Sequence, residues 1–497
     1  MGVALVVCVA LATSAGCSSS GGGASPGAGG RPTAAVGTPA RPAGPAANLS
    51  HELTGGKGTF MGTAIPVDLR AGGYVEDEYL AAGIASSYRT ASALTGDGRW
   101  RFSPDATASY RTRIVVRRPA KASAFSGNVV VEWLNVSGGV DADPEWATLH
   151  EEIMRRGDVW VGVSAQRIGV MGGPVLVKVA GAGSDLAGQG LRAIDPARYG
   201  SLQHPGDGYA FDIYTQIARS LRTGAALGGL HPQRLIAAGE SQSAFAMVTY
   251  YDGVQPLTDA FDGFFVHSRG ATGLPLVGPG KSADLAGSLG GTPAIFRTDQ
   301  GPPVIDVQTE SDVTGILNSS RALQPDTDRF RLWEVTGTAH ADAHLLGANA
   351  SAIDCGAPVN NGTTHLVAKV ALRALTTWLA TGTAPVAAPR IGLISGATPQ
   401  VRRDADGIAL GGIRTPPVDV PVATLSGVPG PKSSTICLLL GSTTPFSTTR
   451  LAQLYPSHAA YQQRYDADAD KTIKAGFVLS DDRAALLAYA DPSAITG

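Results

Sequence analysis

The sequence predicts an α/β fold with a mostly parallel central sheet and helices on both of its faces. From about residue 60 to residue 385, short runs rich in Val, Ile and Phe alternate with stretches in which apolar residues recur at helical spacing. Strand, helix and strand repeated in this order form a parallel sheet. Hydrophobic residues make up 43% of the chain and charged residues 16%, which is enough apolar material for a large core.

The individual elements follow from these runs. Strands are expected at residues 111–116, 128–134, 159–164, 234–238, 261–266, 304–309 and 330–335. The run at 128–134 is nearly continuous in apolar residues, which is typical of a strand buried on both faces. Helices are expected at residues 148–156, 212–222 and 367–379, and Gly382 ends the last of them.

Four segments are predicted along the chain. They are an export signal at residues 1–17, a flexible tether at 18–48, the α/β core at 49–385 and a C-terminal extension packed on the core at 386–497. Two long glycine-rich connections, 165–208 and 271–302, interrupt the regular alternation of the core. Loops of that length are typical of lids or binding loops, so we expect them and the extension to shape a substrate pocket.

The N-terminus has the pattern of an exported protein. Residues 3–13 form an apolar run that is too short to span a membrane, and small residues follow it up to Cys17. Ala15-Gly16-Cys17 resembles a bacterial lipobox, in which Cys17 would be lipidated; an ordinary cleaved signal is the alternative. Residues 18–48 are mostly Ser, Gly, Ala, Pro and Thr, as in a flexible tether. The protein is therefore expected to be secreted or anchored to the cell membrane as a lipoprotein.

Two cysteines remain in the body of the chain, Cys355 and Cys437. A pair of cysteines in an exported protein predicts one disulfide, which would join the core to the C-terminal extension. Two buried free thiols are the alternative.

The segment from Gly239 to Ser243 carries the strongest chemical signal. Its sequence, Gly-Glu-Ser-Gln-Ser, stands between a predicted strand and a helix-like run. A nucleophile elbow needs a serine on such a tight turn, with small residues two positions before and after it. Gly239 meets this need, and Ser243 replaces the usual second glycine. Ser241 is therefore the predicted nucleophile, and a serine that caps an ordinary helix is the alternative.

An acid and a base are expected to follow the nucleophile in that order. Glu310-Ser311-Asp312 comes directly after the strand at 304–309, and we expect Asp312 to be the acid, with Glu310 as the alternative. His340 comes after the strand at 330–335 and is the predicted general base.

A metal site is the rival interpretation of this last segment. His344 lies four residues after His340, and Asp342 lies between them. The usual zinc-binding pair of this spacing carries a Glu next to its first His, and a third ligand is not evident. We therefore expect no metal.

Two backbone N–H groups should stabilise the negative charge that develops on a substrate oxygen. One is expected at Gln242, directly after the nucleophile. The other is expected in the loop after the strand at 128–134, at Asn135 or Val136. The glycines that follow in this loop allow its backbone to approach a substrate closely.

Charge and motifs exclude several classes of function. The formal net charge is −2, so the basic surface of a nucleic-acid-binding protein is not expected. No P-loop and no strand-linked GxGxxG occurs, so no nucleotide cofactor is expected. Contact with a membrane is expected only through the N-terminal anchor, and the sequence does not indicate an oligomeric state.

Several segments resemble a known family. They are residues 73–79 (GYVEDEY), 110–119 (YRTRIVVRRP), the GESQSA elbow, the GTAHAD segment around His340, and residues 411–416 (GGIRTP). With these motifs the chain resembles the α/β-hydrolases and, within them, the mostly bacterial α/β hydrolase domain-containing proteins. The resemblance implies an α/β-hydrolase fold and supports the assignment of Ser241 and His340. It implies little about the substrate, because this group is known mainly by its fold.

The sequence thus predicts an exported serine hydrolase that cleaves a small carboxylic ester through a Ser-His-Asp triad and an acyl-enzyme. Two alternatives remain open. An acyltransferase would use the same residues with an alcohol in place of water. A non-catalytic cell-surface binding protein could also use a hydrolase scaffold.

Overall fold

The computed structural model of the chain describes residues 41–63, 65–180, 184–396 and 398–495. The predicted export signal and Cys17 lie outside these residues. Within them, no helix combines the length and the apolar character that a membrane crossing requires.

Residues 41–47, which belong to the predicted tether, contact the body of the protein. The Ala47 N–H donates a hydrogen bond to the Gln216 carbonyl (3.0 Å), and Arg41 forms ion pairs with Asp259 and Asp262. The part of the chain that packs on the core therefore extends to Arg41.

One large sheet organises the described residues. It contains nine strands in the order β1-β2-β3-β5-β4-β6-β7-β8-β9. The strands β4 to β9 run parallel to one another, whereas β1, β2 and β3 add antiparallel pairings at one edge. Their bounds are Asn48–Glu52 (β1), Tyr74–Thr90 (β2), Phe102–Pro119 (β3), Asn128–Trp133 (β4), Val159–Val163 (β5), Arg234–Glu240 (β6), Gly263–His267 (β7), Val304–Thr309 (β8) and Phe330–Val335 (β9).

The predicted strands from residue 128 onward coincide with β4 to β9 within two residues at each end. The edge of the sheet formed by β1 to β3 differs from the prediction. Strand β2 was not predicted, and β3 is 18 residues long, whereas a short strand was expected at 111–116. Much of β2 and of the first half of β3 is partly exposed and carries Ser, Thr, Ala and Asp. Only the part of β3 around Ile114–Val116 pairs with β5 inside the sheet, and only this part has the continuous apolar run that sequence reasoning detects.

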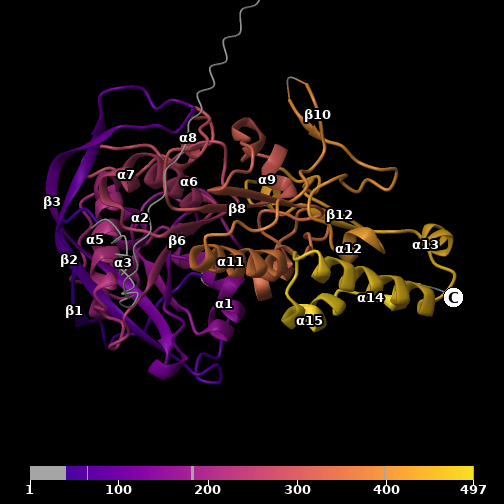
Figure 1. Cartoon of the computed structure of the whole chain (residues 1–497), viewed down its shortest axis with the longest axis horizontal. Coiled ribbons are helices and arrows are strands. Elements are labelled where there is room, and N and C mark those ends of the chain that lie inside the picture. The colour runs from indigo at the N-terminus through magenta and orange to yellow at the C-terminus, as the bar shows by residue number, and fades with distance from the viewer. Residues whose placement is uncertain (1–40, 64, 181–183, 397, 496–497) are drawn as a thin grey trace, which may run out of the picture. The chain divides into compact units, whose positions relative to one another are not determined.

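Helices cover both faces of the sheet (Figure 1). One face packs against α1 (Pro144–Arg156) and α11 (Thr364–Thr381), and the other against α5 (Ala210–Arg222) and α6 (Gln242–Thr249). Strand β4 shows the alternation that this requires: Val130 belongs to the first core, whereas Val129 and Val131 belong to the second.

The other α-helices of the described residues lie in the connections and in the C-terminal part. They are α2 (Arg167–Met171), α3 (Leu191–Ile194), α4 (Pro196–Tyr199), α7 (Gln255–Thr258), α8 (Leu285–Ser288), α9 (Glu310–Thr314), α10 (Ala343–Leu346), α12 (Pro416–Asp419), α13 (Thr448–Leu454), α14 (His458–Lys474) and α15 (Arg483–Leu487). The two long glycine-rich connections thus carry α2 to α4 and α8.

The C-terminal part packs on the core. Leu366 of α11 shares a buried cluster with Ala469 of α14 and Leu486 of α15. Two small antiparallel pairs also belong to it, β10 (Leu393–Ile394) with β11 (Gln400–Val401) and β12 (Ala423–Ser426) with β13 (Ser442–Pro445).

The predicted disulfide is present. It joins Cys355 to Cys437 across a sequence separation of 82 residues. Both cysteines are buried, in a small cluster with Leu346 and Leu440. The covalent bond therefore fixes the segment around residue 437 against the core.

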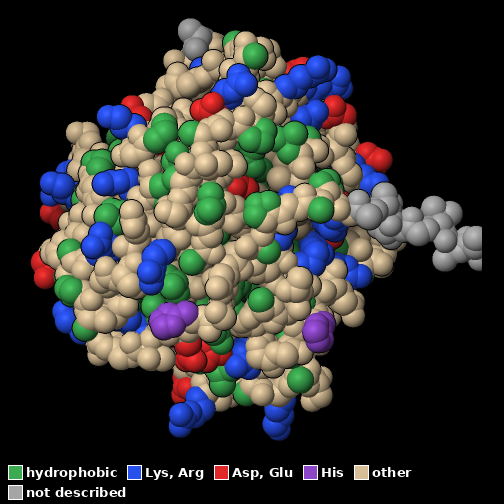
Figure 2. Space-filling view, turned by 90° about the vertical axis from the view of Figure 1, so that its left-hand side faces the viewer, with side chains coloured by type: hydrophobic (Ala, Val, Ile, Leu, Met, Phe, Trp, Pro, Cys, Tyr) green, Lys and Arg blue, Asp and Glu red, His purple; other side chains and the backbone are tan. Residues whose placement is uncertain are grey.

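Figure 2 shows the face on the β1–β3 side of the sheet. Lys and Arg side chains are scattered over this face among apolar and acidic ones.

Candidate active site

Ser241 stands on a sharp turn between β6 and α6. Its backbone has φ 57° and ψ −120°, a combination that a non-glycine residue adopts only where the surroundings enforce it. The Ser241 N–H donates to the His267 carbonyl (3.0 Å). A Cβ at Gly239 would lie 2.8 Å from the Ser243 carbonyl oxygen, so the turn requires glycine there. This is the geometry of a nucleophile elbow.

Ser241, His340 and Asp312 form one hydrogen-bonded line. The Ser241 Oγ lies 2.7 Å from His340 Nε2, and His340 Nδ1 lies 2.8 Å from Asp312 Oδ1. These groups come from three different strand ends, since Ser241 follows β6, Asp312 follows β8 and His340 follows β9. The carboxyl ends of parallel strands meet at one edge of the sheet, and the structure brings the three predicted groups together there.

Local hydrogen bonds hold the acid and the base in place. Thr309 and Asp312 form a capping box at the start of α9, in which Asp312 Oδ2 accepts hydrogen bonds from the Thr309 N–H (2.8 Å) and hydroxyl (2.7 Å). The backbone N–H of His340 donates to the Ser311 hydroxyl at 2.7 Å. The short segment after β8 therefore orients both residues.

The charges of this line reinforce one another. Burial alone would lower the pKa of His340, but the carboxylates of Asp312 and Glu240 outweigh it and raise the pKa above its ordinary value. Burial would raise the pKa of Asp312, but His340 and Thr309 hold it below its ordinary value. The arrangement keeps Asp312 ionised beside an imidazole that readily accepts a proton, which is what a general base next to a serine requires.

Glu310, the alternative acid, points away from His340. Its carboxylate pairs with Arg403 (2.6 Å) and accepts hydrogen bonds from the N–H groups of Gly337 (2.8 Å) and Gly427 (2.9 Å). Glu310 thus links the C-terminal part to the end of β9, and Asp312, not Glu310, lies next to the His340 ring.

The candidate N–H donors lie on either side of Ser241. Gln242 is the first residue of α6, so the helix offers no acceptor to its N–H. The Asn135 N–H is already bonded to the Ala142 carbonyl (2.9 Å), whereas the Val136 N–H donates to the Gln242 side-chain oxygen (3.2 Å), which a substrate oxygen could replace. Of the two predicted alternatives, the geometry favours Val136.

Sequence reasoning missed the role of Glu240 and Asn135 as a pair. Glu240 precedes the serine in the elbow, is buried, and its Oε1 lies 3.4 Å from His340 Nε2. The Asn135 side-chain amide donates to the Glu240 backbone carbonyl (3.1 Å) and carboxylate (3.4 Å). Burial raises the pKa of Glu240 to about 7, although His340 and His267 act in the opposite direction. A second carboxyl group therefore faces the base.

The residues of the rival metal interpretation separate in the structure. His344 lies on α10 and stacks on His365, with ring centroids 3.7 Å apart. Asp342 caps α10 by accepting a hydrogen bond from the Leu345 N–H at 2.9 Å. Within the described ranges, no group of three or more His, Cys, Asp or Glu side chains could hold a metal ion.

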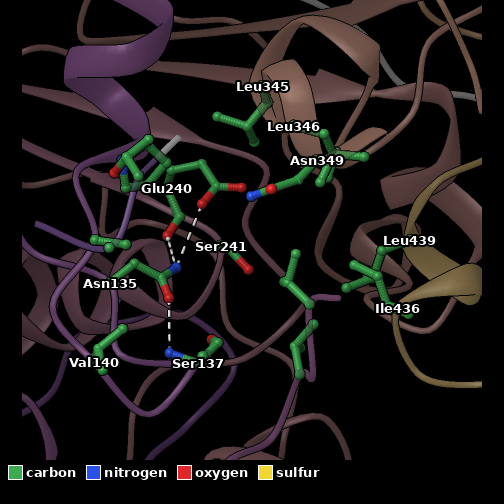
Figure 3. Close-up of a pocket in the computed structure, with 18 of the residues that line it drawn as sticks. Asn135, Ser137, Val140, Glu240, Ser241, Leu345, Leu346, Asn349, Ile436 and Leu439 are labelled. Carbon is green, nitrogen blue, oxygen red and sulfur yellow. Dashed lines mark hydrogen bonds between the residues drawn. The ribbon is translucent and has the colours of Figure 1, made fainter. Parts of the chain in front are cut away.

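Two cavities meet at Ser241. The large cavity has a volume of about 210 Å³ and includes Glu240 and His340 in its wall. The small cavity has a volume of about 40 Å³ and lies beside Gln242 and Phe245. Ser137, Val177, Ser241 and Leu439 line both. Figure 3 shows the large cavity, with Asn135 and Glu240 on one side of Ser241 and Ile436 and Leu439 on the other.

A search of solved structures matches several hydrolases at low sequence identity. A lidless serine hydrolase from Xanthomonas campestris is 14% identical over 50% of this chain and 83% of its own, with a TM-score of 0.27. An esterase from Rhizomucor miehei is 11% identical over 60% and 84%, with a TM-score of 0.30. Carboxyl esterase 2 from Tuber melanosporum is 13% identical over 59% and 88%, with a TM-score of 0.29.

A comparison with curated proteins gives no significant match. The sequence profile of the family described as "Alpha/beta hydrolase domain" matches residues 42–488, which is most of the chain. That range contains the whole sheet and the Ser241, Asp312 and His340 segments. The chain therefore belongs to the α/β hydrolase domain family and has the α/β-hydrolase fold.

Proposed function

We propose that the protein is an exported serine hydrolase that cleaves carboxylic esters. The observation that carries this proposal is the hydrogen-bonded line from Ser241 through His340 to Asp312. Ser241, at one end of this line, lies in the wall of a cavity large enough for a small molecule. A serine hydroxyl so placed is activated for attack on an acyl carbon.

The residues supply each step of acyl transfer. His340 Nε2 takes the hydroxyl proton as Ser241 Oγ attacks the carbonyl carbon, and the N–H groups of Gln242 and Val136 stabilise the oxyanion. His340 then gives the proton to the leaving alcohol, and the acyl group remains on Ser241. Water, activated by His340, hydrolyses this acyl-enzyme, while Asp312 keeps the imidazole oriented and stabilises its protonated form.

The cavity walls favour an uncharged substrate. None of the described residues that line the large or the small cavity is Lys or Arg. An anionic substrate would lack a counter-charge there, whereas a neutral ester places apolar carbon against the leucines and valines of the walls.

Export is the second part of the proposal. The apolar run at residues 3–13 and the segment that ends at Cys17 form the signal, and Cys17 is the lipidation site of an anchored form. A disulfide between Cys355 and Cys437 fits the oxidising environment outside the cytoplasm. Acyl labelling of the expressed protein, with Cys17→Ala as control, tests the anchor.

The catalytic part is tested with 4-nitrophenyl esters and the variant Ser241→Ala. We expect kcat to fall by about 10⁵-fold, because the nucleophile is lost. Ser243→Ala is the matched control, because Ser243 lies two residues after Ser241 and its buried hydroxyl has no hydrogen-bond partner among the described residues. It should retain activity within about threefold. Full activity in Ser241→Ala, or loss of labelling by a fluorophosphonate in Ser243→Ala alone, would contradict the proposal.

A further inference from the structure

The two cavities differ in which reacting group they contain. His340 lies in the wall of the large cavity, together with Ala341, Leu345 and Leu346 of the same segment. The described residues that line the small cavity include Gln242 but not His340. Since Ser241 belongs to both walls, an ester bound at Ser241 extends into one cavity on each side of its carbonyl carbon.

Proton transfer decides which side of the ester occupies which cavity. His340 Nε2 lies 2.7 Å from Ser241 Oγ and must deliver its proton to the leaving alcohol oxygen. The alcohol must therefore lie on the His340 side, in the large cavity. The acyl group, which stays on Ser241 and needs no contact with the base, is left with the small cavity beside Gln242 and Phe245.

The volumes then set the size of each part. One water-sized group needs about 10–15 Å³ on this measure. The small cavity of about 40 Å³ thus holds about three or four non-hydrogen atoms, and the large cavity of about 210 Å³ holds about 15 to 20. The small cavity is lined by Leu285, Leu289, Ile316 and Leu317, so a longer acyl chain meets these side chains.

The walls of the large cavity also specify its occupant. Leu345, Leu346 and Ile436 provide apolar surface, and Asn135, Glu240 and Asn349 provide polar groups (Figure 3). An alcohol that is mostly apolar and carries a hydroxyl, ether or carbonyl group matches this combination.

We propose that the protein prefers esters of a short acid, from acetyl to butyryl, with a bulky uncharged alcohol that binds in the large cavity. This inference rests on the proposed function and specifies its substrate class. Leu289 limits the length of the acyl group, and Leu345 contacts the alcohol. Both leucines are half-buried at one wall of their own cavity, so they form a matched pair for substitution.

The experiment uses the full-length protein and two ester series. The first keeps 4-nitrophenol as the alcohol and lengthens the acid from two to ten carbons. The second keeps acetate as the acid and enlarges the alcohol from ethyl through benzyl to 2-naphthyl. The value of kcat/KM is measured for the wild type, Leu289→Ala, Leu345→Ala and Leu345→Trp, each beside its Ser241→Ala counterpart.

For the wild type, we expect kcat/KM to fall at least tenfold between butyrate and hexanoate and to rise with alcohol size. Leu289→Ala should raise hexanoate hydrolysis at least tenfold and leave the order of the acetates unchanged. Leu345→Ala should leave the acyl profile unchanged, and Leu345→Trp should lower hydrolysis of 2-naphthyl acetate at least tenfold while ethyl acetate changes less than threefold. Fluorophosphonate labelling of Ser241 verifies that each variant that keeps this serine is folded.

Two results overturn the inference and leave the proposed function intact. In one, hydrolysis depends on Ser241, but Leu345→Ala instead of Leu289→Ala raises kcat/KM for esters with longer acyl chains. In the other, octanoate is hydrolysed as well as acetate by the wild type. If no ester is hydrolysed in a Ser241-dependent manner, the proposed function itself is wrong and the inference falls with it.

Discussion

The line of Ser241, His340 and Asp312 and the walls of the two cavities are held in place by different means. Each residue of the line stands within a few positions of a strand end, on β6, β8 or β9. The walls come in part from the loops that follow β4 and β9, but also from the long connections around Val177 and Leu289 and from the C-terminal part near Leu439. Pairing within a sheet fixes strand ends to one another, whereas long connections depend on side-chain packing and on cross-links.

This difference assigns separate roles to the two regions. A reaction needs its groups fixed within about half an ångström, which a sheet edge provides. Substrate choice needs only a wall of a certain shape, which loops can vary without moving the sheet. Substitutions at the strand ends should therefore lower kcat, and substitutions in the walls should change KM or the choice of ester.

Among substitutions that keep the Ser241 nucleophile, the largest effect is expected from Asp312→Asn. Without the carboxylate, His340 loses the partner that raises its pKa and stabilises its protonated form. We expect kcat to fall by about 10³–10⁴-fold at neutral pH with little change in KM. Steady-state kinetics on a 4-nitrophenyl ester measures both constants.

Glu310→Gln is the control for this prediction. Glu310 lies two residues before Asp312 along the chain, and the substitution removes the negative charge that pairs with Arg403. Thermal stability should fall, while kcat should stay within about threefold of the wild type. If Glu310→Gln lowers kcat more than Asp312→Asn does, the acid has been assigned to the wrong residue.

The second prediction concerns the disulfide, which holds the wall instead of the reacting groups. Cys355→Ser with Cys437→Ser removes a cross-link over 82 residues, and the free energy of unfolding should fall by about 2–5 kcal/mol. Ile436 and Leu439 line the large cavity on either side of Cys437, so KM should rise more than kcat falls. Calorimetry and steady-state kinetics measure the two effects.

An unchanged KM together with a large loss of kcat would mean that the disulfide supports the strand ends and not the cavity wall. Incubation of the wild type with a reductant, followed by the same assays, provides the matched comparison without a substitution.

The same contrast explains which features could be predicted from sequence. Strands β4 to β9 are buried on both faces, so each appears as a short apolar run, and the predicted fold class is confirmed by the family assignment. The groups after β6, β8 and β9 follow from chain order, because parallel strands bring their carboxyl ends together. Strand β2 left no such run, because many of its side chains are partly exposed.

The sequence was less informative about which of two residues a few positions apart takes a given place in the site. A capping-box pattern from Thr309 to Asp312 was present in the sequence and would have favoured Asp312 over Glu310. The partner of Glu310, Arg403, lies 93 residues away along the chain, and no local pattern indicates such a pair. The cavity walls depend on contacts of this long-range kind, so their volumes could not be predicted.

The smallest effect is expected from Glu240→Gln, which changes the charge next to the base. Burial raises the pKa of Glu240 from 4.5 to about 7. A carboxyl group whose pKa is raised by folding stabilises the protein fully below pH 4.5, and this contribution is lost as the pH rises to about 7. The stability difference between wild type and Glu240→Gln should therefore shift in favour of the variant across that window, as denaturant unfolding at several pH values would show.

Glu240→Gln should also change the pH dependence of activity. His340 must be neutral to take the serine proton, and the Glu240 carboxylate favours its protonated form. The pH at which kcat/KM falls on the acid side reports the coupled titration of His340 and Glu240. With glutamine in place of Glu240, this acid limb should move to lower pH by about half to one unit. Glu145 is also buried near Glu240, and burial raises its pKa well above the ordinary value. Glu145→Gln therefore serves as the control that alters a buried carboxyl group near Glu240 instead of the one beside His340. If the acid limb shifts with Glu145→Gln but not with Glu240→Gln, the pKa of His340 is set by Glu145 and not by Glu240, and the prediction is wrong.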